Sequence, residues 1–106
     1  MNLGLQDKRV VVTGASRGIG AAIAKGFLQE GAKACIVSRG SEQLYQTKGT
    51  LISEFGYHRV VAAECDCTDP SSLASLRASI KKKWKGVDIV VANIGDGRSV
   101  PDPLPD

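Results

Sequence analysis

The chain has 106 residues, of which 42% are hydrophobic, and carries a formal charge of +3 at pH 7. This length predicts one domain that buries roughly two-thirds of the surface of its unfolded chain. The charge excess is small, so it indicates an anionic ligand only where basic residues gather at one site. Residues 1–9 lack the apolar core of a signal peptide, and no apolar run is long enough to span a membrane. We therefore expect a soluble, cytoplasmic chain without a membrane partner.

The cysteines predict reduced thiols rather than a disulfide or metal framework. Cys35, Cys65 and Cys67 lie in or beside apolar runs, and the last two are too close for an ordinary disulfide. A Cys-x-Cys pair could bind a metal, but His58 is the single histidine and no second cysteine pair exists. No metal site is expected.

Four apolar, β-branched runs predict strands at residues 9–13, 34–38, 59–64 and 88–93. Their unbroken apolar character is typical of strands that are covered on both faces. Between the first two runs we expect a helix over residues 18–30 that stops at Gly31. Its predicted core stripe consists of Ile19, Ala22, Ile23, Gly26 and Phe27.

Two further helices separate the remaining strands. The second begins after Ser41 and ends at Gly56, although Thr47, Gly49 and Thr50 lower its helix propensity. Its expected inward residues are Leu44, Leu51, Ile52 and Phe55. The third has Asp69 as N-cap and Pro70 at its first position, and runs to Gly86. Its expected apolar residues are Leu73, Leu76, Ile80 and Trp84.

Strands that alternate with helices predict right-handed crossovers and a parallel α/β sheet, in the order 3-2-1-4 with helices on both faces. This is a doubly wound, Rossmann-like sheet truncated to about four strands. Residues 1–106 would form one partial Rossmann-like domain. From residue 94 on, the two glycines and three prolines predict a loop, with residues 96–106 as a loop or tail.

A glycine-rich turn joins the first predicted strand to the first helix. The sequence Thr13-Gly14-Ala15-Ser16-Arg17-Gly18-Ile19-Gly20 follows Val10-Val11-Val12. Glycines let the backbone turn sharply and approach an anion, and the free N–H groups of a helix start favour a phosphate. The alternative is a tight connection that binds no ligand, but the flanking strand and helix favour a pyrophosphate site.

This segment resembles the Thr-Gly-x3-Gly-Ile-Gly signature of short-chain dehydrogenases and reductases. The resemblance covers residues 5 to about 100 and corresponds to the amino-terminal part of that fold. It implies a nicotinamide dinucleotide cofactor and an oxidoreductase that transfers hydride between this cofactor and a carbonyl or alcohol. The residues that it assigns to the cofactor in this turn are Gly14, Ser16, Arg17, Gly18, Ile19 and Gly20.

Ser38 and Arg39 follow the second predicted strand, where an acidic residue would accept hydrogen bonds from the ribose 2′-hydroxyl of NAD. An arginine instead supplies a permanently charged, planar donor to a 2′-phosphate, and Arg17 could reach the same group. The sequence thus favours NADP over NAD. The alternative is that both arginines are solvated surface cations.

Two more segments match the family in part. Cys65-Asp66-Cys67 resembles its acidic step after the third strand, which implies that Asp66 contacts the adenine amino group and the Cys67 backbone lies along the ring. Asp66 could instead only cap a turn. Ala92-Asn93-Ile94-Gly95 stands where the family writes Asn-Asn-Ala-Gly, which gives Asn93 and Gly95 cofactor-side roles.

The family's catalytic Tyr-x3-Lys pair is missing, since Tyr45 and Lys48 have the wrong spacing and no lysine follows Tyr57 at the required spacing. We expect an inactive NADP-binding portion of a longer enzyme whose small-molecule substrate the sequence does not define. The alternative is a short non-catalytic dinucleotide-binding protein that acts as a sensor or partner subunit.

Partners other than the cofactor are also predicted. Lys81-Lys82-Lys83 fits a solvated helix end better than a nucleic-acid site, so no nucleic acid is expected. The fourth strand would leave one edge unpaired, which predicts a homo-oligomer with Ile89, Val90 and Val91 at or near the contact.

Overall fold

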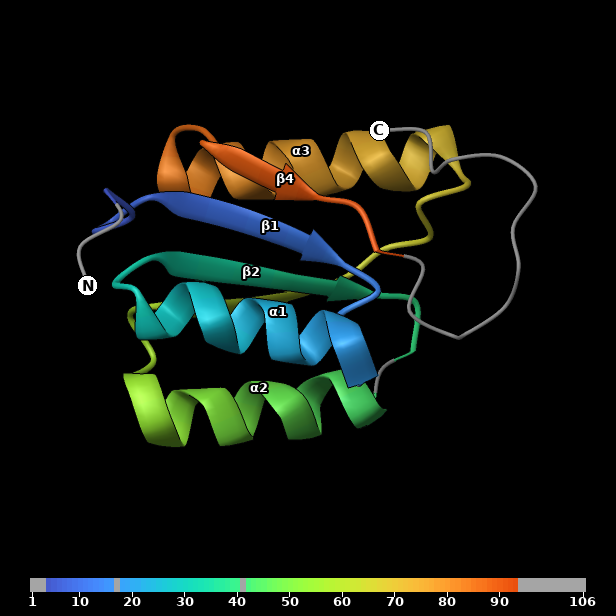
Figure 1. The fold of residues 1–106 in the computed structure, drawn as a ribbon. Helices are drawn as coiled ribbons and strands as arrows, with labels where there is room; N and C mark the ends of the chain where they lie inside the picture. Colours follow the sequence, from blue (N-terminus) through green and yellow to red (C-terminus); the bar gives the residue numbers. More distant parts are fainter. Residues whose placement is uncertain (1–3, 17, 41, 94–106) are drawn as a thin grey trace.

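Four parallel strands form one sheet in the order β3-β2-β1-β4, as the sequence predicts (Figure 1). The computed structural model describes residues 4–16, 18–40 and 42–93. The strands are β1 (Arg9–Thr13), β2 (Lys33–Ser38), β3 (Val60–Glu64) and β4 (Ile89–Val91). In the register, Val11 lies between Cys35 of β2 and Val90 of β4. All four strands therefore point their carboxyl ends to the same edge of the sheet.

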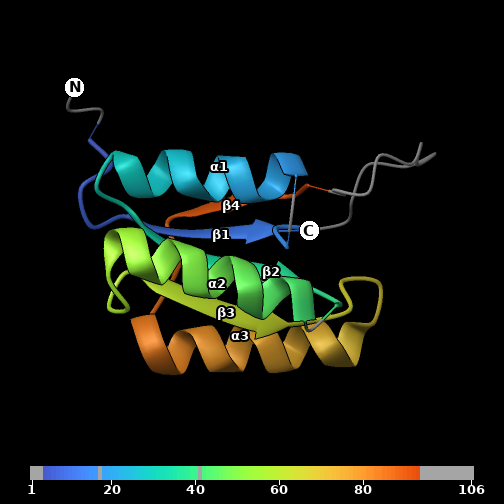
Figure 2. The same cartoon turned by 90° about the horizontal axis from the view of Figure 1, so that it is seen from below.

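The helices cover both faces of the sheet, in agreement with a truncated Rossmann-like fold (Figure 2). α1 (Gly18–Gln29) and α2 (Glu42–Phe55) pack on one face, and α3 (Pro70–Trp84) packs on the other. Among the described residues, no helix is both long and apolar enough to cross a membrane.

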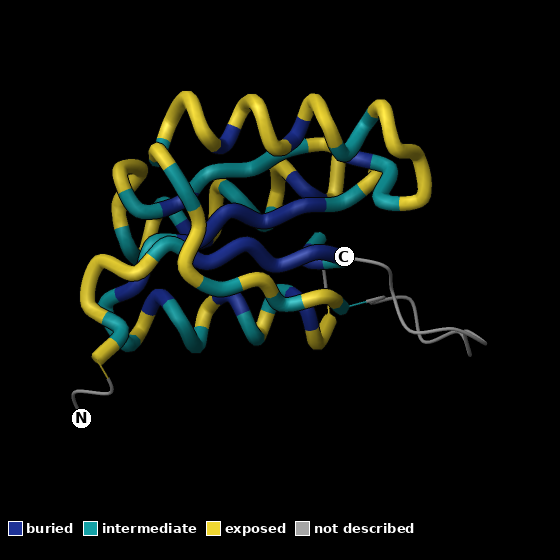
Figure 3. Tube along the Cα trace, turned by 90° about the horizontal axis from the view of Figure 1, so that it is seen from above, coloured by how far each residue is buried: buried dark blue, intermediate teal, exposed yellow. Residues whose placement is uncertain are grey.

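The core lies on both sides of the two central strands. Val10, Val12 and Ile36 face α1 and α2, whereas Val11 and Cys35 face α3. Successive strand residues point to opposite faces, so a strand that is buried on both sides needs an unbroken apolar run. In Figure 3 the buried colour is accordingly concentrated along the central strands.

The predicted core stripe of α1 is only partly correct. The buried residues are Gly20, Ala24 and Leu28, whereas Ile19 is 70% exposed and Ala22 is exposed. Ile23 and Phe27 pack only at the margin of the core. The buried row lies one position beyond the predicted one, because the small Gly20 and Ala24 let the helix approach the strands closely.

The ends of α2 and α3 follow the predicted capping signals. α2 buries Leu44 and Leu51 and is followed by Gly56 at φ 94°. Asp69 caps α3 by accepting a hydrogen bond from the Ser71 N–H at 3.0 Å. α3 ends at Trp84 rather than at Gly86, because Lys85 takes the left-handed conformation at φ 65°.

The fourth strand is shorter than the predicted 88–93, because polar contacts occupy its flanks. Asp88 binds Arg9 at the start of β1, with Nε 3.1 Å from Oδ2. At the other end, the Asn93 N–H donates to the Thr13 hydroxyl at 3.0 Å. β2 begins one residue earlier than expected, at Lys33, and β3 one residue later, at Val60.

Candidate functional site

The residues that the sequence assigns to a ligand site follow the carboxyl ends of the strands. The glycine turn follows β1, Ser38 and Arg39 follow β2, Asp66 and Cys67 follow β3, and Asn93 follows β4. Parallel strands bring these ends to one edge of the sheet, which is where open α/β sheets bind their ligands. Arg17 and Gly95 lie outside the described residues.

Glycine is required at three positions of the turn. Gly14 and Gly18 both have φ 61°, in the left-handed region that other residues rarely enter. A Cβ atom added to Gly20 would lie 2.1 Å from the Gly14 carbonyl oxygen and 2.7 Å from Asn93 Nδ2. The turn therefore folds against the start of α1 more closely than any side chain would permit.

A cluster of hydrogen bonds fixes the turn to the end of β4. Asn93 Nδ2 donates to the Gly14 carbonyl at 3.2 Å. Thr13 is buried at 8% exposure, and its hydroxyl accepts from the Asn93 N–H. Asn93 thus joins the end of β4 to the turn that follows β1. Thr13 belongs to the motif, but the sequence analysis did not select it as a site residue.

Arg39 stands exposed at the end of β2. Within the described part of the chain, no hydrogen bond or ion pair engages its guanidinium group. It lies close enough to Asp66 for its charge to contribute to a lowered pKa of that carboxyl group. Ser38 Oγ accepts a hydrogen bond from the Gly40 N–H at 3.2 Å. Among the described residues, Arg39 is thus an exposed cation without a hydrogen-bonded partner beside the end of β3.

Asp66 forms the turn cap that the sequence left as an alternative. Its Oδ1 accepts hydrogen bonds from the Thr68 N–H at 3.0 Å and the Thr68 hydroxyl at 2.6 Å. These bonds are the main cause of its lowered pKa, with Arg39 a smaller one. Oδ2 has no partner among the described residues, so the carboxylate retains one oxygen for a ligand.

The Cys35 and Cys67 thiols have raised pKa values and stay protonated at neutral pH. Burial raises the pKa of Cys67 to about 11, with the neighbouring Cys65 adding to the shift. Burial also raises the pKa of Cys35 to about 12. The parts of the chain that the structure describes contain no cluster of three or more potential metal ligands. Cys67 can therefore offer its backbone at this edge but not a thiolate.

Two further residues concern the glycine turn: the sequence predicted a site role for Ile19 but not for Thr47. Ile19 is 70% exposed at the first turn of α1, which leaves its side chain open to a ligand. Thr47 of α2 was missed: its hydroxyl donates to the Ser16 carbonyl in the glycine turn at 2.5 Å. No local sequence pattern predicts a contact between residues 31 positions apart.

Neither described tyrosine has the surroundings of an activated proton donor. The Tyr45 hydroxyl donates to Glu64 Oε2 at 3.1 Å, and this hydrogen bond raises the pKa of Tyr45. A catalytic tyrosine beside a lysine needs the opposite shift. Tyr57 is 68% exposed and stacks near His58. Both are surface residues.

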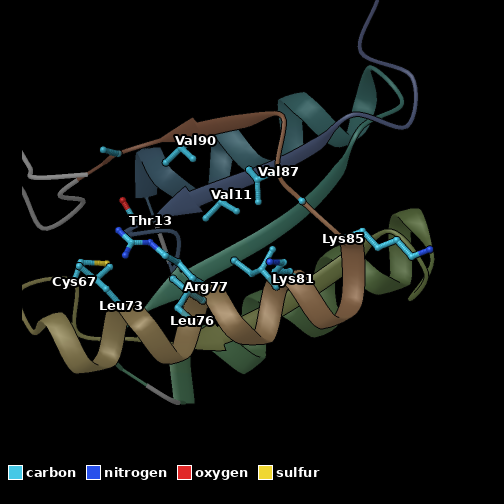
Figure 4. Close-up of a pocket in the computed structure, with 13 residues that line it drawn as sticks. Val11, Thr13, Cys67, Leu73, Leu76, Arg77, Lys81, Lys85, Val87 and Val90 are labelled. Carbon is cyan, nitrogen blue, oxygen red and sulfur yellow. The ribbon is translucent and has the colours of Figure 1, made fainter.

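A cavity of about 300 Å³ lies on the other face of the sheet, between α3 and β4 (Figure 4). Val11, Leu76 and Val90 contribute apolar surface, and Arg77 and Lys81 come from α3. Among the described residues, no acidic side chain lines it. The cavity reaches the strand-end edge at Thr13 and Cys67 but does not include the glycine turn.

Comparisons with known proteins identify long, related enzymes. Over residues 8–103 the sequence matches the short chain dehydrogenase family. The chain is 37% identical to L-sorbose reductase from Gluconobacter frateurii, solved with NADPH and L-sorbose, with a TM-score of 0.85 over 92% of this chain and 37% of that one. Menthone neomenthol reductase from Mentha piperita is 38% identical, with a TM-score of 0.78 over 84% of this chain and 32% of that one.

A curated relative gives the same result. Chlorophyll(ide) b reductase from Arabidopsis thaliana is 36% identical over 86 residues, which cover 81% of this chain and 24% of the relative. The chain thus spans less than two-fifths of the length of each protein named. A family match over nearly its whole length, the strand order β3-β2-β1-β4 and the glycine turn agree: this chain belongs to the short-chain dehydrogenase family.

Proposed function

We propose that this chain is the NADP(H)-binding portion of a short-chain oxidoreductase. The full-length protein would transfer hydride between the nicotinamide and a carbonyl or alcohol substrate. Residues 1–106 would form one partial cofactor-binding domain. The proposed contact residues are Gly14, Ser16, Arg17, Gly18, Ile19, Gly20, Ser38, Arg39, Asp66, Cys67, Asn93 and Gly95.

The conformation of the glycine turn carries the proposal. Gly14 and Gly18 hold φ angles of 61°, and Gly20 has no room for a Cβ atom, so this segment is built for close backbone approach at a helix start. A helix N-terminus with bare backbone favours an anion through its free N–H groups and its dipole. The residues therefore fit a pyrophosphate.

The choice of NADP over NAD rests on Arg39. Its guanidinium group is exposed and unpaired within the described residues, and it follows β2, where doubly wound folds read the adenosine ribose. A carboxylate at this place would repel a 2′-phosphate, whereas an arginine can bind it with paired hydrogen bonds. Two relatives, L-sorbose reductase and a Pseudomonas aeruginosa protein, were solved in complex with this form of the cofactor.

We expect no turnover by the chain itself. The cofactor supplies hydride when bound, but no tyrosine of the sequence is followed by a lysine at the required spacing. Tyr45, whose pKa is raised by Glu64, is a poor proton donor to substrate. A purified chain that oxidises NADPH with a carbonyl substrate, and loses this activity on Tyr45→Phe, would contradict this expectation.

Calorimetric titration with NADPH and NADH tests the proposed cofactor. Charge-assisted hydrogen bonds contribute about 1.5 to 3 kcal/mol each, so NADPH should bind roughly ten- to a hundredfold more tightly. Circular dichroism establishes first that the chain is folded. Equal affinities would contradict the preference for NADP, and a folded chain that binds neither would contradict the proposed function.

We further propose that the chain self-associates through the edge of β4. This strand pairs with β1 alone in the described sheet, and Val90 is 58% exposed beside it. Unpaired backbone and exposed apolar side chains at an edge favour pairing with another strand. Ile89 and Val91 pack toward α1 and α2, so Val90 would provide most of the contact.

A further inference from the structure

Three hydrogen bonds from three different elements hold the backbone of the glycine turn. The Gly14 carbonyl accepts from Asn93 Nδ2 at 3.2 Å, and the Ala15 N–H donates to the Val37 carbonyl of β2 at 3.0 Å. The Ser16 carbonyl accepts from the Thr47 hydroxyl of α2. Two of these ties come from the ends of neighbouring strands, but the third comes from a helix side chain.

The direction of the Thr47 hydroxyl is unusual for a threonine inside a helix. Such hydroxyls often donate to the carbonyl four residues earlier in the same helix. Thr50, one turn further along α2, does this with the Gln46 carbonyl at 3.2 Å. Thr47 is half-buried, and its hydroxyl leaves its own helix to reach Ser16. Its contact is therefore tertiary, whereas that of Thr50 is local.

The Ser16 carbonyl matters because of the charge at the proposed site. A carbonyl oxygen carries partial negative charge and would repel a phosphate that it faced. In a trans peptide the C=O and the N–H point in opposite directions, so the orientation of one sets the orientation of the other. A donor that binds the carbonyl from α2 keeps it satisfied and directed at that helix.

We propose that Thr47 is a positioning residue for the anion-binding turn, acting through the Ser16 carbonyl rather than by contact with the ligand. This inference rests on the proposed function. It extends the site to α2, a helix that the sequence motif does not include. Loss of the hydroxyl would let the peptide after Ser16 rotate, and dinucleotide binding would have to restore the productive orientation.

The test compares three variants by calorimetric titration with NADP⁺. Thr47→Val removes the hydroxyl at nearly constant shape and should weaken binding about three- to tenfold, the effect of losing one neutral hydrogen bond. Thr47→Ser keeps a hydroxyl and should bind within about twofold of the unsubstituted chain. Thr50→Val removes a hydroxyl from the same helix and should also leave affinity unchanged. Urea unfolding of each variant checks that the fold is retained.

The outcomes separate this inference from the proposed function. If the unsubstituted chain binds NADP⁺ and Thr47→Val binds it with equal affinity, the inference is overturned but the proposed function is not. Equal weakening in Thr47→Val and Thr47→Ser, or in Thr50→Val, also overturns it, because packing or helix stability would then be the cause. If Thr47→Val does not fold, Thr47→Ala takes its place under the same criteria. In that case, a loss of NADP⁺ affinity in Thr47→Ser also overturns the inference. A folded unsubstituted chain without affinity for NADP⁺ contradicts the proposed function itself.

Discussion

Gly20 and Gly26 lie on the same helix but differ in the space beside them. A Cβ atom at Gly20 would meet the Gly14 carbonyl oxygen at 2.1 Å, whereas nothing lies within 4 Å of one at Gly26. Gly20→Ala should therefore lower the free energy of unfolding by about 1 to 3 kcal/mol and weaken NADP(H) binding. Gly26→Ala should raise the free energy of unfolding by up to about 1 kcal/mol, because alanine loses less entropy in a helix.

Urea unfolding measures the free energy of unfolding of Gly20→Ala and Gly26→Ala, and calorimetry measures their affinity for NADPH. A Gly20→Ala variant as stable as the unsubstituted chain would show that the turn does not approach α1 so closely. A normal NADPH affinity in that variant would separate the turn from the proposed site.

Arg39 provides the most direct residue-level test of cofactor choice. Arg39→Asp replaces the proposed partner of the 2′-phosphate by a carboxylate, so NADPH affinity should fall at least tenfold and the preference over NADH should disappear. Lys82→Asp makes the same change in charge on the exposed last turn of α3, near the opposite end of the sheet. If titration calorimetry finds equal losses of NADPH affinity in both variants, Arg39 acts only through the net charge of the chain.

The site residues that the sequence predicts are those with local signals. Gly14, Gly18 and Gly20 lie in one short turn, and their spacing alone indicates a backbone that must bend and pack closely. Thr47 could not be found in this way, since in the sequence it only lowers the propensity of its helix. Its contact with Ser16 exists only once α2 is folded against the turn.

At the scale of elements, Arg9 and Asp88 join the starts of β1 and β4. Asp88 accepts from the Arg9 backbone at 2.8 Å and from its side chain at 3.1 Å, while Arg9 Nη1 donates to the Trp84 carbonyl at 2.6 Å. The Arg9 guanidinium is the main cause of the lowered pKa of Asp88. One pair thus fixes two strands and the end of α3.

This pair predicts a dependence of stability on pH. Because the pKa of Asp88 is lower in the folded chain than its ordinary 3.8, its contribution is complete above that value and is lost as pH falls through the folded pKa. Asp88→Asn should therefore be less stable at pH 7 and lose less stability on acidification. Urea unfolding between pH 7 and pH 3 compares the two slopes, and parallel curves would contradict the prediction.

Helix ends were predictable from the sequence, whereas the buried face of α1 was not. Asp69 and Pro70 mark the start of α3 through bonds within a few residues. The face of α1 depends instead on how closely the helix can approach the sheet, which Gly20 and Ala24 decide by being small. Apolar spacing along the sequence does not contain this information and selected Ile19, which the fold leaves exposed.

At the scale of the whole molecule, α3 is the single described helix on its face, and the cavity beside it reaches β4 (Figure 4). Val90 lies on this side of the sheet, so the β4 edge and the apolar cavity form one continuous surface. Each backbone hydrogen bond recovered there would contribute roughly 0.5 to 1.5 kcal/mol, and apolar burial about 25 cal/mol per Å². Together these terms can offset the entropic cost of association.

Sedimentation at tens of micromolar tests this association. We expect a dimer or higher oligomer, and Val90→Lys should shift it toward monomer by placing a charge at the edge. Tyr57→Lys introduces the same charge at an exposed aromatic residue near the start of β3 and should have no effect. A folded, monodisperse monomer with fast amide exchange along Ile89–Val91 would show that the edge is tolerated without a partner.

In the proposed function, the carboxyl ends of the strands hold NADP(H). Titration of isotopically labelled chain with NADP⁺, followed by amide nuclear magnetic resonance, tests it most directly because each amide reports its own surroundings. We predict shifts at Gly14, Ser16, Gly18, Gly20, Arg39 and Asp66, and none at Lys8, which precedes β1, or at Lys33, which begins β2. The proposed function would be contradicted if saturating NADP⁺ shifted no amide resonance in the glycine turn, or shifted only the amides of residues that line the cavity between α3 and β4.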